Sequence, residues 1–471
     1  MSSPASRETE AYLAWGRAHR HRHRVVRPVA GAALHEAVGA ERAPVLAHGR
    51  GRSYGDSCLN EGGVLLDTGR LDRFVAFDPA TGLLEAQAGV RLAEVLAHVC
   101  RPAADGSAWF PPVVPGTRWL TLGGALANDV HGKNHHREGS FGCHVPGFTL
   151  LRGDGSHLAC SAERNPELYR ATIGGLGLTG LVLDLKLQLR RVPGLMLLAE
   201  DVRMDSLDEF YALSAESEAG WEYSVAWVDC LASGRSLGRG IFTRANHAPG
   251  PVGEAAPLGS RLAVPLAPPF SPLNRLTLRM FNALYRRKLG WRRRSLRLST
   301  YAPALFPLDA IAGWNRLYGR HGFFQYQCVL PPENARDGVA EMLETVARAG
   351  EGSFLAVLKT MGSRLSPGLL SFPMPGTTLA LDFPNRGAAT LALLDRLDAI
   401  TQAARGRVYP AKDGRMSPAA FAAGYPDGEL ARFRDSVDPA FSSSFWRRVG
   451  GGGAAAENAV VAAPSRDLVA A

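Results

Sequence analysis

The stretch of sequence that says most about the fold is Ala47-His48-Gly49-Arg50-Gly51-Arg52-Ser53-Tyr54-Gly55-Asp56-Ser57. Its three glycines follow Val45-Leu46-Ala47, a short apolar run that predicts a strand. A glycine-rich turn after a strand exposes consecutive backbone amides and lets an anion approach them closely. The spacing is neither the G-x-G-x-x-G of a Rossmann turn nor the Gly-Lys-Ser/Thr of a Walker loop. Taken alone, the loop could equally be a tight structural turn.

Two further glycine-rich segments follow this loop. Pro115-Gly116-Thr117 precedes Thr121-Leu122-Gly123-Gly124, where a glycine pair opens a helix of small residues, and the segment 172–180 contains another glycine run before a strand. Small residues let a flat ring or a diphosphate lie against the backbone, although close helix packing would need them too. Three such segments in this order are more specific than any one of them.

The hydrophobic pattern predicts an α+β protein with more than one domain. Between residues 25 and 190, short strands alternate with glycine turns and helices; from 193 to about 406, longer amphipathic helices lie between strands. Strands are predicted at 63–67, 84–90, 181–189, 224–228, 324–330 and 378–383, and helices from 92, at 341–349 and at 389–404. We expect domains at 1–192 and 193–406, a returning segment at 407–449, an irregular loop at 257–272 and a disordered tail at 450–471.

Composition leaves several classes of partner open. The chain has 471 residues, is 46% hydrophobic and 21% charged, and contains no apolar run of membrane-spanning length. The N-terminus has no apolar signal region, so we expect a cytoplasmic protein, and its six cysteines, without C-x-x-C pairs, are expected to be buried thiols. The net charge of +9 would suit nucleic acid, an anionic membrane or a phosphorylated substrate. Base bias in a genome also produces such a charge, so the net charge alone does not identify the partner.

The three glycine segments resemble the FAD-binding domain of the vanillyl-alcohol oxidase / p-cresol methylhydroxylase superfamily. The segments at 49–56, 115–118, 129–136, 139–142, 226–229, 324–327, 371–376 and 411–413 are similar to the oxidase subunits of decaprenylphosphoryl-β-D-ribose 2′-epimerases, in order from about residue 25 to about 448. The resemblance implies a two-part FAD-binding domain plus an α+β substrate (cap) domain with an antiparallel sheet.

The resemblance also implies which residues bind the cofactor. In this superfamily the first loop wraps the FAD diphosphate, the second passes along the flavin, and the third closes the site. Many relatives attach the flavin covalently through a histidine at the position of Arg52, so we expect non-covalent FAD here. The residues expected to contact FAD are Ala47, His48, Gly49, Arg50, Gly51, Arg52, Ser53, Tyr54, Gly55, Ser57, Pro115, Gly116, Thr117, Thr121, Leu122, Gly123, Gly124, Asn128, Asp129, His131, Gly132, Gly177, Gly180, Leu181, Val182 and Tyr409.

Oxidation of an alcohol by a flavin requires a base near the substrate hydroxyl. Lys412 is the first candidate, because the chain returns to the FAD domain there and the resemblance places it beside the flavin; an exposed ion pair with Asp413 is the alternative. His131 is the second candidate. His131, His135 and His136 lack a carboxylate at ligand spacing, so we expect no metal. Substrate contacts implied by the resemblance fall on Tyr54, Lys133, Trp227, Gln325, Gln327, Lys359 and Asp382.

The chain departs from the family pattern at three positions. Ala380 replaces the cysteine of the well-known mycobacterial members, Thr378 replaces an asparagine, and Phe306 stands where tyrosine is expected. These changes bear on the choice of substrate and leave the flavin site intact.

A basic segment between Arg275 and Arg297 contains nine arginines and lysines, no acid and several interleaved aromatic residues. Such a segment suits an anionic membrane surface, and a plain solvated loop is an equal alternative. No nucleic-acid module accompanies it, and we expect no nucleic-acid partner.

The sequence therefore predicts an FAD-dependent oxidoreductase acting on CH–OH groups. The resemblance implies oxidation of the 2′-hydroxyl of a polyprenylphosphoryl-ribose-like substrate to a ketone, the oxidase half of an epimerisation that makes a cell-wall arabinan precursor. An NAD(P)H-dependent short-chain reductase would be the partner, and peripheral contact with the inner membrane face is an option. An aldonolactone (D-arabinono-1,4-lactone oxidase-like) or sugar-alcohol oxidase is the alternative enzyme, and a degenerate flavin-binding protein is the non-enzymatic one.

Overall fold

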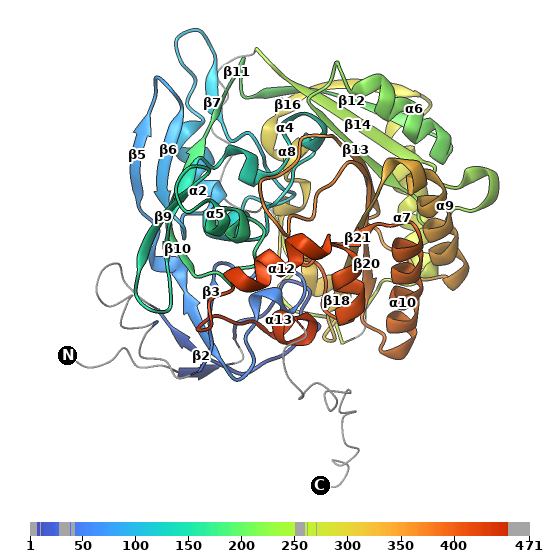
Figure 1. Ribbon diagram of the computed structural model, residues 1–471. Helices are drawn as coiled ribbons and strands as arrows, with labels where there is room; N and C mark the ends of the chain where they lie inside the picture. The colour runs from blue at the N-terminus through green and yellow to red at the C-terminus, as the bar shows by residue number, and fades with distance from the viewer. Residues whose placement is uncertain are drawn as a thin grey trace.

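The computed structural model describes residues 7–9, 11–27, 38, 43–249, 260, 262–269 and 271–450 (Figure 1). The structure describes residues 260, 262–269 and 271–272 of the predicted loop at 257–272, which are irregular apart from a two-residue strand, and the predicted tail beyond Gly450 lies outside the described residues. The N-terminal part begins with a four-stranded sheet in which β2, β4 and β3 are parallel neighbours. In order across the sheet, its strands are β1 (Arg7–Thr9), β2 (His23–Val26), β4 (Val64–Asp67) and β3 (Val45–His48).

A second, antiparallel sheet of five strands follows in the N-terminal part. Its core is closed by apolar side chains of α2 and α3, including Leu92, Val95 and Leu126. In order, its strands are β5 (Phe74–Asp78), β6 (Leu83–Gln87), β10 (Leu181–Gln188), β8 (Gly147–Leu151) and β9 (His157–Ser161). In the described ranges of this part, α-helices span α2 (Leu92–Val99), α3 (Leu122–Ala127), α4 (His135–Glu138) and α5 (Pro166–Thr172), and β7 (Ala108–Phe110) pairs with β11 (Arg190–Val192).

The chain from Met196 to Val408, called the second half below, forms an antiparallel sheet of eight strands. Helices α6 (Leu207–Ser217), α9 (Pro332–Ala349) and α10 (Ala388–Ala403) bury apolar side chains against one face of it, on the right of Figure 1. Because side chains alternate along a strand, the other face is free to line a site. The strand order is β16 (Arg294–Thr300), β12 (Met196–Met204), β14 (Gly240–Ala248), β13 (Tyr223–Val228), β19 (Val357–Met361), β20 (Gly376–Pro384), β18 (Phe323–Leu330) and β21 (Arg407–Val408).

The chain after β21 packs on the N-terminal part. Helices α11 (Pro418–Ala423), α12 (Asp427–Ser436) and α13 (Ser444–Val449) share a core with residues 171–178, and α12 lies beside α5 in Figure 1. Arg152 and Asp438 form an ion pair at 3.0 Å across this contact. The segment between β21 and α11, which contains Lys412, is therefore held by the eight-stranded sheet at one end and by the N-terminal part at the other.

The predicted strands and helices recur with shifted ends. Helix α9 begins at Pro332, nine residues before the predicted start, because its first turns carry polar residues such as Glu333 and Arg336 that hide the apolar period. The basic segment is a helix and a strand, and the loop alternative is wrong. Helix α7 (Arg275–Arg286) begins at Asn274, whose side chain accepts hydrogen bonds from the amides of Leu276 and Thr277.

Strand β15 (Leu262–Ala263) pairs in parallel with β17 (Ile311–Ala312), and helix α8 (Tyr301–Leu305) follows β16. All six cysteines are free; Cys100, Cys160, Cys230 and Cys328 are buried as expected from the sequence, whereas Cys58 and Cys143 are only half-buried. Within the described residues, no helix combines the length and apolar character needed to cross a bilayer.

Candidate active site

A cavity of about 1500 Å³ lies between the N-terminal part and the open face of the eight-stranded sheet. All three glycine segments contribute to its wall, and so do Trp227 on β13, Gln325 and Gln327 on β18 and Lys359 on β19. Pockets for one drug-sized ligand usually measure about 300–1,000 Å³. The cavity therefore has room for a dinucleotide and a second molecule.

The first glycine loop presents unpaired backbone amides to this cavity. None of the backbone amides of residues 49–53 donates a hydrogen bond to a described residue, although all five residues line the cavity. Gly51 has a φ of +59°, which an L side chain adopts with difficulty. A row of free amides in a tight turn is the arrangement that binds an anion such as a diphosphate.

The second glycine segment lies against the first. Thr121 begins α3, and its hydroxyl accepts a hydrogen bond of 3.1 Å from the Gly124 amide. A Cβ on Gly49 would lie 2.5 Å from the same hydroxyl oxygen, so the two loops touch only because Gly49 has no side chain. A Cβ on Gly116 would meet no protein atom within 4 Å, and Gly116 lines the cavity. Its bare backbone leaves that space for a ligand.

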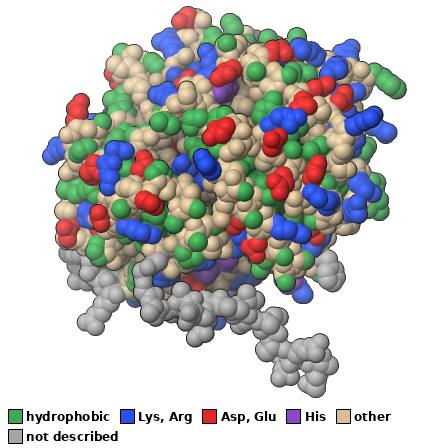
Figure 2. All heavy atoms as spheres, turned by 45° about the vertical axis from the view of Figure 1, so that its right-hand side comes forward, with side chains coloured by type: hydrophobic (Ala, Val, Ile, Leu, Met, Phe, Trp, Pro, Cys, Tyr) green, Lys and Arg blue, Asp and Glu red, His purple; other side chains and the backbone are tan. Residues whose placement is uncertain are grey.

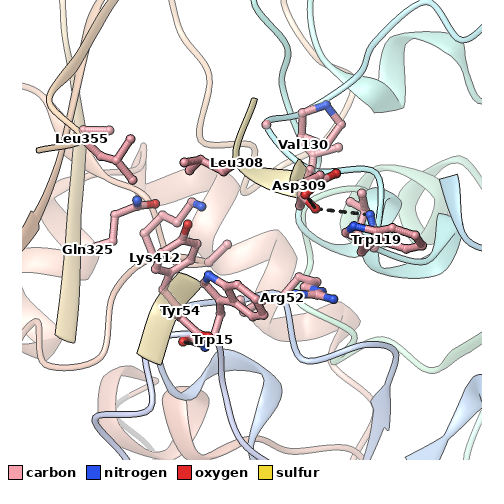
Figure 3. Close-up of a pocket in the computed structure, with 18 of the residues that line it drawn as sticks. Trp15, Arg52, Tyr54, Trp119, Val130, Leu308, Asp309, Gln325, Leu355 and Lys412 are labelled. Atoms are coloured by element: carbon pink, nitrogen blue, oxygen red, sulfur yellow. Dashed lines mark hydrogen bonds between the residues drawn. The ribbon is translucent and has the colours of Figure 1, made fainter. Parts of the chain in front are cut away.

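An N-terminal segment that the sequence reasoning missed also covers the first glycine loop. The Trp15 amide donates to the Ser53 carbonyl at 2.7 Å, and the Gly16 amide donates to the Tyr54 carbonyl. The Arg52 guanidinium lies 4.3 Å from the centre of the Trp15 ring. Figure 3 shows these two side chains near each other. The only local signal was a tryptophan before a glycine, and the pairing itself is a tertiary contact.

His131 lies among polar partners on the cavity wall. Its Nδ1 lies 2.9 Å from Lys359 Nζ, and its Nε2 lies 3.0 Å from the side-chain amide of Gln327. Burial, followed by the charge of Lys359, holds the pKa of His131 well below its usual range. Lys359 also donates to the Gly132 carbonyl at 2.5 Å, and burial lowers the pKa of Lys359 to about 7. His131 is therefore neutral near pH 7.

Lys412 lies in the connection between β21 and α11 and lines the cavity. Its Nζ lies 3.8 Å from the centre of the Tyr54 ring and has no hydrogen-bond partner among the described residues. Burial lowers the pKa of Lys412 to about 7, although Asp382 opposes the shift. Figure 3 shows Lys412 and Tyr54 side by side, with Gln325 nearby. The surface ion pair with Asp413 is wrong, because Asp413 pairs with Arg448 at 2.9 Å instead.

Asp382 lies behind this wall and is fully buried. It accepts hydrogen bonds from Gln325 at 2.5 Å and from the Tyr318 hydroxyl at 3.1 Å. Burial raises its pKa to about 7. It therefore orients Gln325 and does not itself line the cavity.

Most of the predicted site residues come together at the cavity. Lys412, His131, Tyr54, Lys133, Trp227, Gln325, Gln327 and Lys359 line it, with Tyr409 and most of the glycine-loop residues. Besides Asp382, four predicted residues lie behind the wall. His48 is buried with its Nδ1 3.0 Å from the Cys58 carbonyl, and Asp129 accepts from Ser140, Ser371 and the Gly142 amide. The other two are Gly55, packed on the Asp413 carbonyl, and the buried Leu122.

His135 and His136, the other two histidines of this segment, do not line the cavity. His136 Nε2 lies 2.9 Å from the Trp221 carbonyl, and His135 Nδ1 accepts from the Gly362 amide. Both contacts tie the histidine segment to the second half of the chain. Phe306, at a position of family departure, is buried in the core and does not line the cavity.

Asp309 is a second residue that the sequence did not reveal. It accepts hydrogen bonds from the Thr117 hydroxyl at 2.7 Å and from the Arg118 amide at 2.9 Å. These contacts join the chain after α8 to the second glycine segment, and the dashed line in Figure 3 lies here. No motif marks this aspartate in the sequence.

Comparisons with known proteins identify the class of protein to which this chain belongs. Residues 24–161 match a family model described as an FAD binding domain, and the chain is an FAD-dependent oxidoreductase. It is 37% identical over 422 residues to decaprenylphosphoryl-β-D-ribose oxidase of Mycolicibacterium smegmatis, covering 86% of this chain and 89% of that protein. The chain belongs to the decaprenylphosphoryl-β-D-ribose oxidase family.

Two other relatives are informative. An uncharacterized protein of Streptomyces coelicolor is 38% identical over 361 residues, which are 73% of this chain and 96% of that protein. A putative D-arabinono-1,4-lactone oxidase of Neurospora crassa is 27% identical over 144 residues, 30% of this chain and 24% of that protein. The more distant likeness is confined to a smaller part of the chain.

The residues at the cavity fit FAD. The free amides of residues 49–53 would hold the diphosphate. Gly116 and the small residues of α3 leave room for a flat ring against the second glycine segment. Ser57 Oγ and Arg52 Nε are buried polar atoms of cavity-lining residues that lack a hydrogen-bond partner among the described residues. Unpartnered polar groups in one loop are what a missing polar ligand leaves behind.

Proposed function

We propose that this chain oxidises a secondary hydroxyl of a sugar to a ketone, and that the sugar is carried on a polyprenyl phosphate. The observation that carries the proposal is the amine of Lys412, which faces the cavity with a pKa lowered to about 7 and no described hydrogen-bond partner. The Mycolicibacterium relative is named for decaprenylphosphoryl-ribose, so we assign the 2′-hydroxyl of such a ribose as the reacting group.

FAD, when bound, supplies the acceptor for the hydride that leaves the carbon. Lys412 takes the hydroxyl proton, because a neutral amine is a base and its pKa lies close to neutral pH. The proton taken by Lys412 and the hydride that leaves the carbon together account for both hydrogens lost from the CH–OH group. Tyr54, whose ring contacts the lysine, and Gln325 restrict where the ammonium group can lie.

Protein groups engage both ring nitrogens of His131. Its Nδ1 lies beside the amine of Lys359, and its Nε2 lies beside the side-chain amide nitrogen of Gln327. Neither nitrogen therefore has a free lone pair to take a proton from a substrate. We assign His131 to positioning Lys359 and Gln327, and Lys412 to proton removal.

We propose that FAD is bound without a covalent bond. Arg52 stands where related proteins carry the attaching histidine, and its guanidinium stacks on Trp15. We further propose that both N-terminal sheets, residues 1–192, and the returning segment 407–449 form one two-part FAD-binding domain. The cap would then be 193–406. The packing of α12 on α5 supports this division.

If an epimer is the final product, a second enzyme must reduce the ketone. We propose an NAD(P)H-dependent short-chain reductase as that partner, because hydride return to the opposite face of the ketone completes an inversion.

We also propose a peripheral contact with an anionic membrane, at its inner face. Helix α7 exposes Leu276, Met280 and Leu284 by 58% or more, and Trp291 beyond it is fully exposed. Arginines are interleaved with these apolar side chains. On the face shown in Figure 2, basic and acidic side chains are interspersed. An apolar and basic helix beside the cavity suits a lipid substrate.

The test is anaerobic flavin bleaching by a panel of compounds: a farnesylphosphoryl-ribose, free ribose, an aldonolactone and a sugar alcohol. We expect the phosphoribosyl lipid to reduce the flavin fastest. Bleaching by the lactone and not by the phosphoribosyl lipid would establish the aldonolactone oxidase alternative instead. Bound FAD that no compound reduces would favour the degenerate flavin-binding protein.

A further inference from the structure

Three cationic side chains from distant parts of the sequence meet at one end of the cavity. Lys133 follows α3, Lys288 follows α7, and Arg297 lies on β16; all three line the cavity. In the described wall, the acids are Asp201 and Asp309, and Asp309 is engaged by Thr117 and Arg118. The sequence predicts that Lys288 and Arg297 belong to a basic segment that faces a membrane or forms a solvated loop, and only the fold turns them toward the cavity.

Asp201 holds two of these cations loosely. Its Oδ2 lies 3.4 Å from Lys288 Nζ and 3.4 Å from Arg297 Nε, while its Oδ1 accepts from the Thr243 hydroxyl at 2.7 Å. Charge-assisted N–H···O bonds are usually about 2.7–2.9 Å long. An ammonium has three donors and a guanidinium five, so one carboxylate oxygen satisfies neither group. The site keeps free donors and an excess of positive charge.

Lys133 adds a third charge without a counter-ion. Its ammonium donates to the carbonyls of Ala304 and Leu305, which are neutral acceptors, and it forms no ion pair with a described acid. Burial, followed by the charge of Arg297, lowers the pKa of Lys133 to about 8. Two like charges held close together in a partly buried wall are stabilised when an anion binds between them.

The cluster adjoins both the reacting group and an aromatic wall. Lys133 is two residues from His131, and its charge contributes to the lowered pKa of Lys359, which contacts His131. On the other side, the rings of Trp227 and Tyr285 lie 4.7 Å apart between centroids. An anion here would lie between the hydroxyl-oxidising end and the aromatic side chains of Trp227 and Tyr285.

We propose that Lys133, Lys288 and Arg297 form a subsite for the phosphoryl group of the substrate. The inference rests on the proposed function and deepens it. In a glycosyl phosphate the phosphate on C1 neighbours the 2′-hydroxyl, so the two groups must bind a few ångströms apart. A phosphate ester offers several oxygen acceptors to three cationic donors, and an isoprenoid tail would follow the aromatic wall.

The test is ligand binding to the FAD-loaded protein, read from the change in flavin absorbance, with inorganic phosphate, farnesyl phosphate and farnesol as probes. Arg297→Gln should weaken farnesyl phosphate binding by about 10- to 100-fold, the range expected for losing a hydrogen bond to a charged group. Asp201→Asn should strengthen it, because the competing carboxylate is removed. Arg292→Gln, in the same segment but exposed and outside the cavity wall, is the matched control and should bind as the wild type does.

The probes separate the two sources of phosphate. Much tighter binding of farnesyl phosphate than of inorganic phosphate supports a lipid headgroup, and equal binding supports a free sugar phosphate. Farnesol that binds as tightly as farnesyl phosphate would overturn the subsite, and so would Arg297→Gln binding at wild-type strength. The double variant Asp201→Asn/Arg297→Gln, which preserves local charge balance, should remain weaker than Asp201→Asn alone; equality would also overturn the subsite.

Binding needs no turnover, so the two proposals fail separately. If phosphoribosyl lipid does not bleach the flavin but Arg297-dependent phosphate binding persists, the proposed reaction is wrong and the subsite stands. If the lipid bleaches the flavin with the same KM in Arg297→Gln as in the wild type, the subsite is wrong and the reaction stands.

Discussion

Replacing Lys412 by alanine should stop proton removal while leaving the cofactor site in place. The amides of residues 49–53 and the start of α3 do not depend on the lysine side chain. An unperturbed lysine, with a pKa near 10.5, would be neutral in only about one molecule in 3,000 at pH 7. With a pKa of about 7, half of the molecules carry the neutral amine. Burial therefore increases the active fraction by about 10³-fold.

The expected loss on Lys412→Ala is about 10²–10⁴-fold in the rate of flavin reduction, the usual range for general-base catalysis. Rapid anaerobic mixing measures this step without the later acceptor step. In the wild type the rate should fall tenfold per pH unit below about 7 and level off above it, because only the deprotonated amine accepts a proton. In Lys412→Ala this dependence should disappear, and added ethylamine should restore part of the rate.

Lys186→Ala is a suitable control, because Lys186 is an exposed lysine on β10 paired with Glu85 at 3.9 Å. It should reduce flavin at the wild-type rate. If Lys412→Ala is loaded with FAD and bleaches as fast as the wild type, Lys412 is not the base. His131→Ala would then become the variant to examine, and its FAD content would have to be measured first, since His131 follows the glycine-rich helix α3.

Three further outcomes can be checked independently. Acid precipitation should release FAD into the supernatant, because Arg52 cannot form the histidyl bond to the flavin; flavin retained in the denatured pellet would contradict this. Reagents that trap an active-site thiol of the mycobacterial relatives should leave no adduct by intact mass, because Ala380 in the cavity wall has no sulfur; an adduct within the β20 peptide would show that the segment is misaligned. The triple change Arg279→Gln/Arg287→Gln/Arg292→Gln should weaken binding to anionic vesicles at low salt by about 1 kcal/mol per charge. Neutralising Arg336, Arg348 and Arg432, exposed arginines outside this segment, should have a smaller effect, and equal losses would argue against a specific membrane face.

The sequence by itself determined the local elements and the class of cofactor. The glycine spacing at 49–55 and the Gly123-Gly124 pair are short-range signals, since a tight turn or a close approach requires glycine whatever lies elsewhere. Strands such as β18 and β20 followed from apolar, β-branched and aromatic runs, with ends shifted by one or two residues. The resemblance predicted that Lys412 and His131 belong to the site, and both line the cavity.

Only the tertiary structure decided how charges are shared around the cavity. Asp382 was expected at the substrate and lies behind Gln325, because a carboxylate with 0% exposure is satisfied by neighbours and not by a ligand. Lys288 and Arg297, expected on an outer face, reach the cavity because β16 pairs with β12 and both cations lie beside Asp201. Trp15 joins the first glycine loop across a separation that no periodicity encodes. Burial and neighbouring charge, which lower the pKa of Lys412, arise from contacts far apart in the chain, and a sequence pattern carries no record of them.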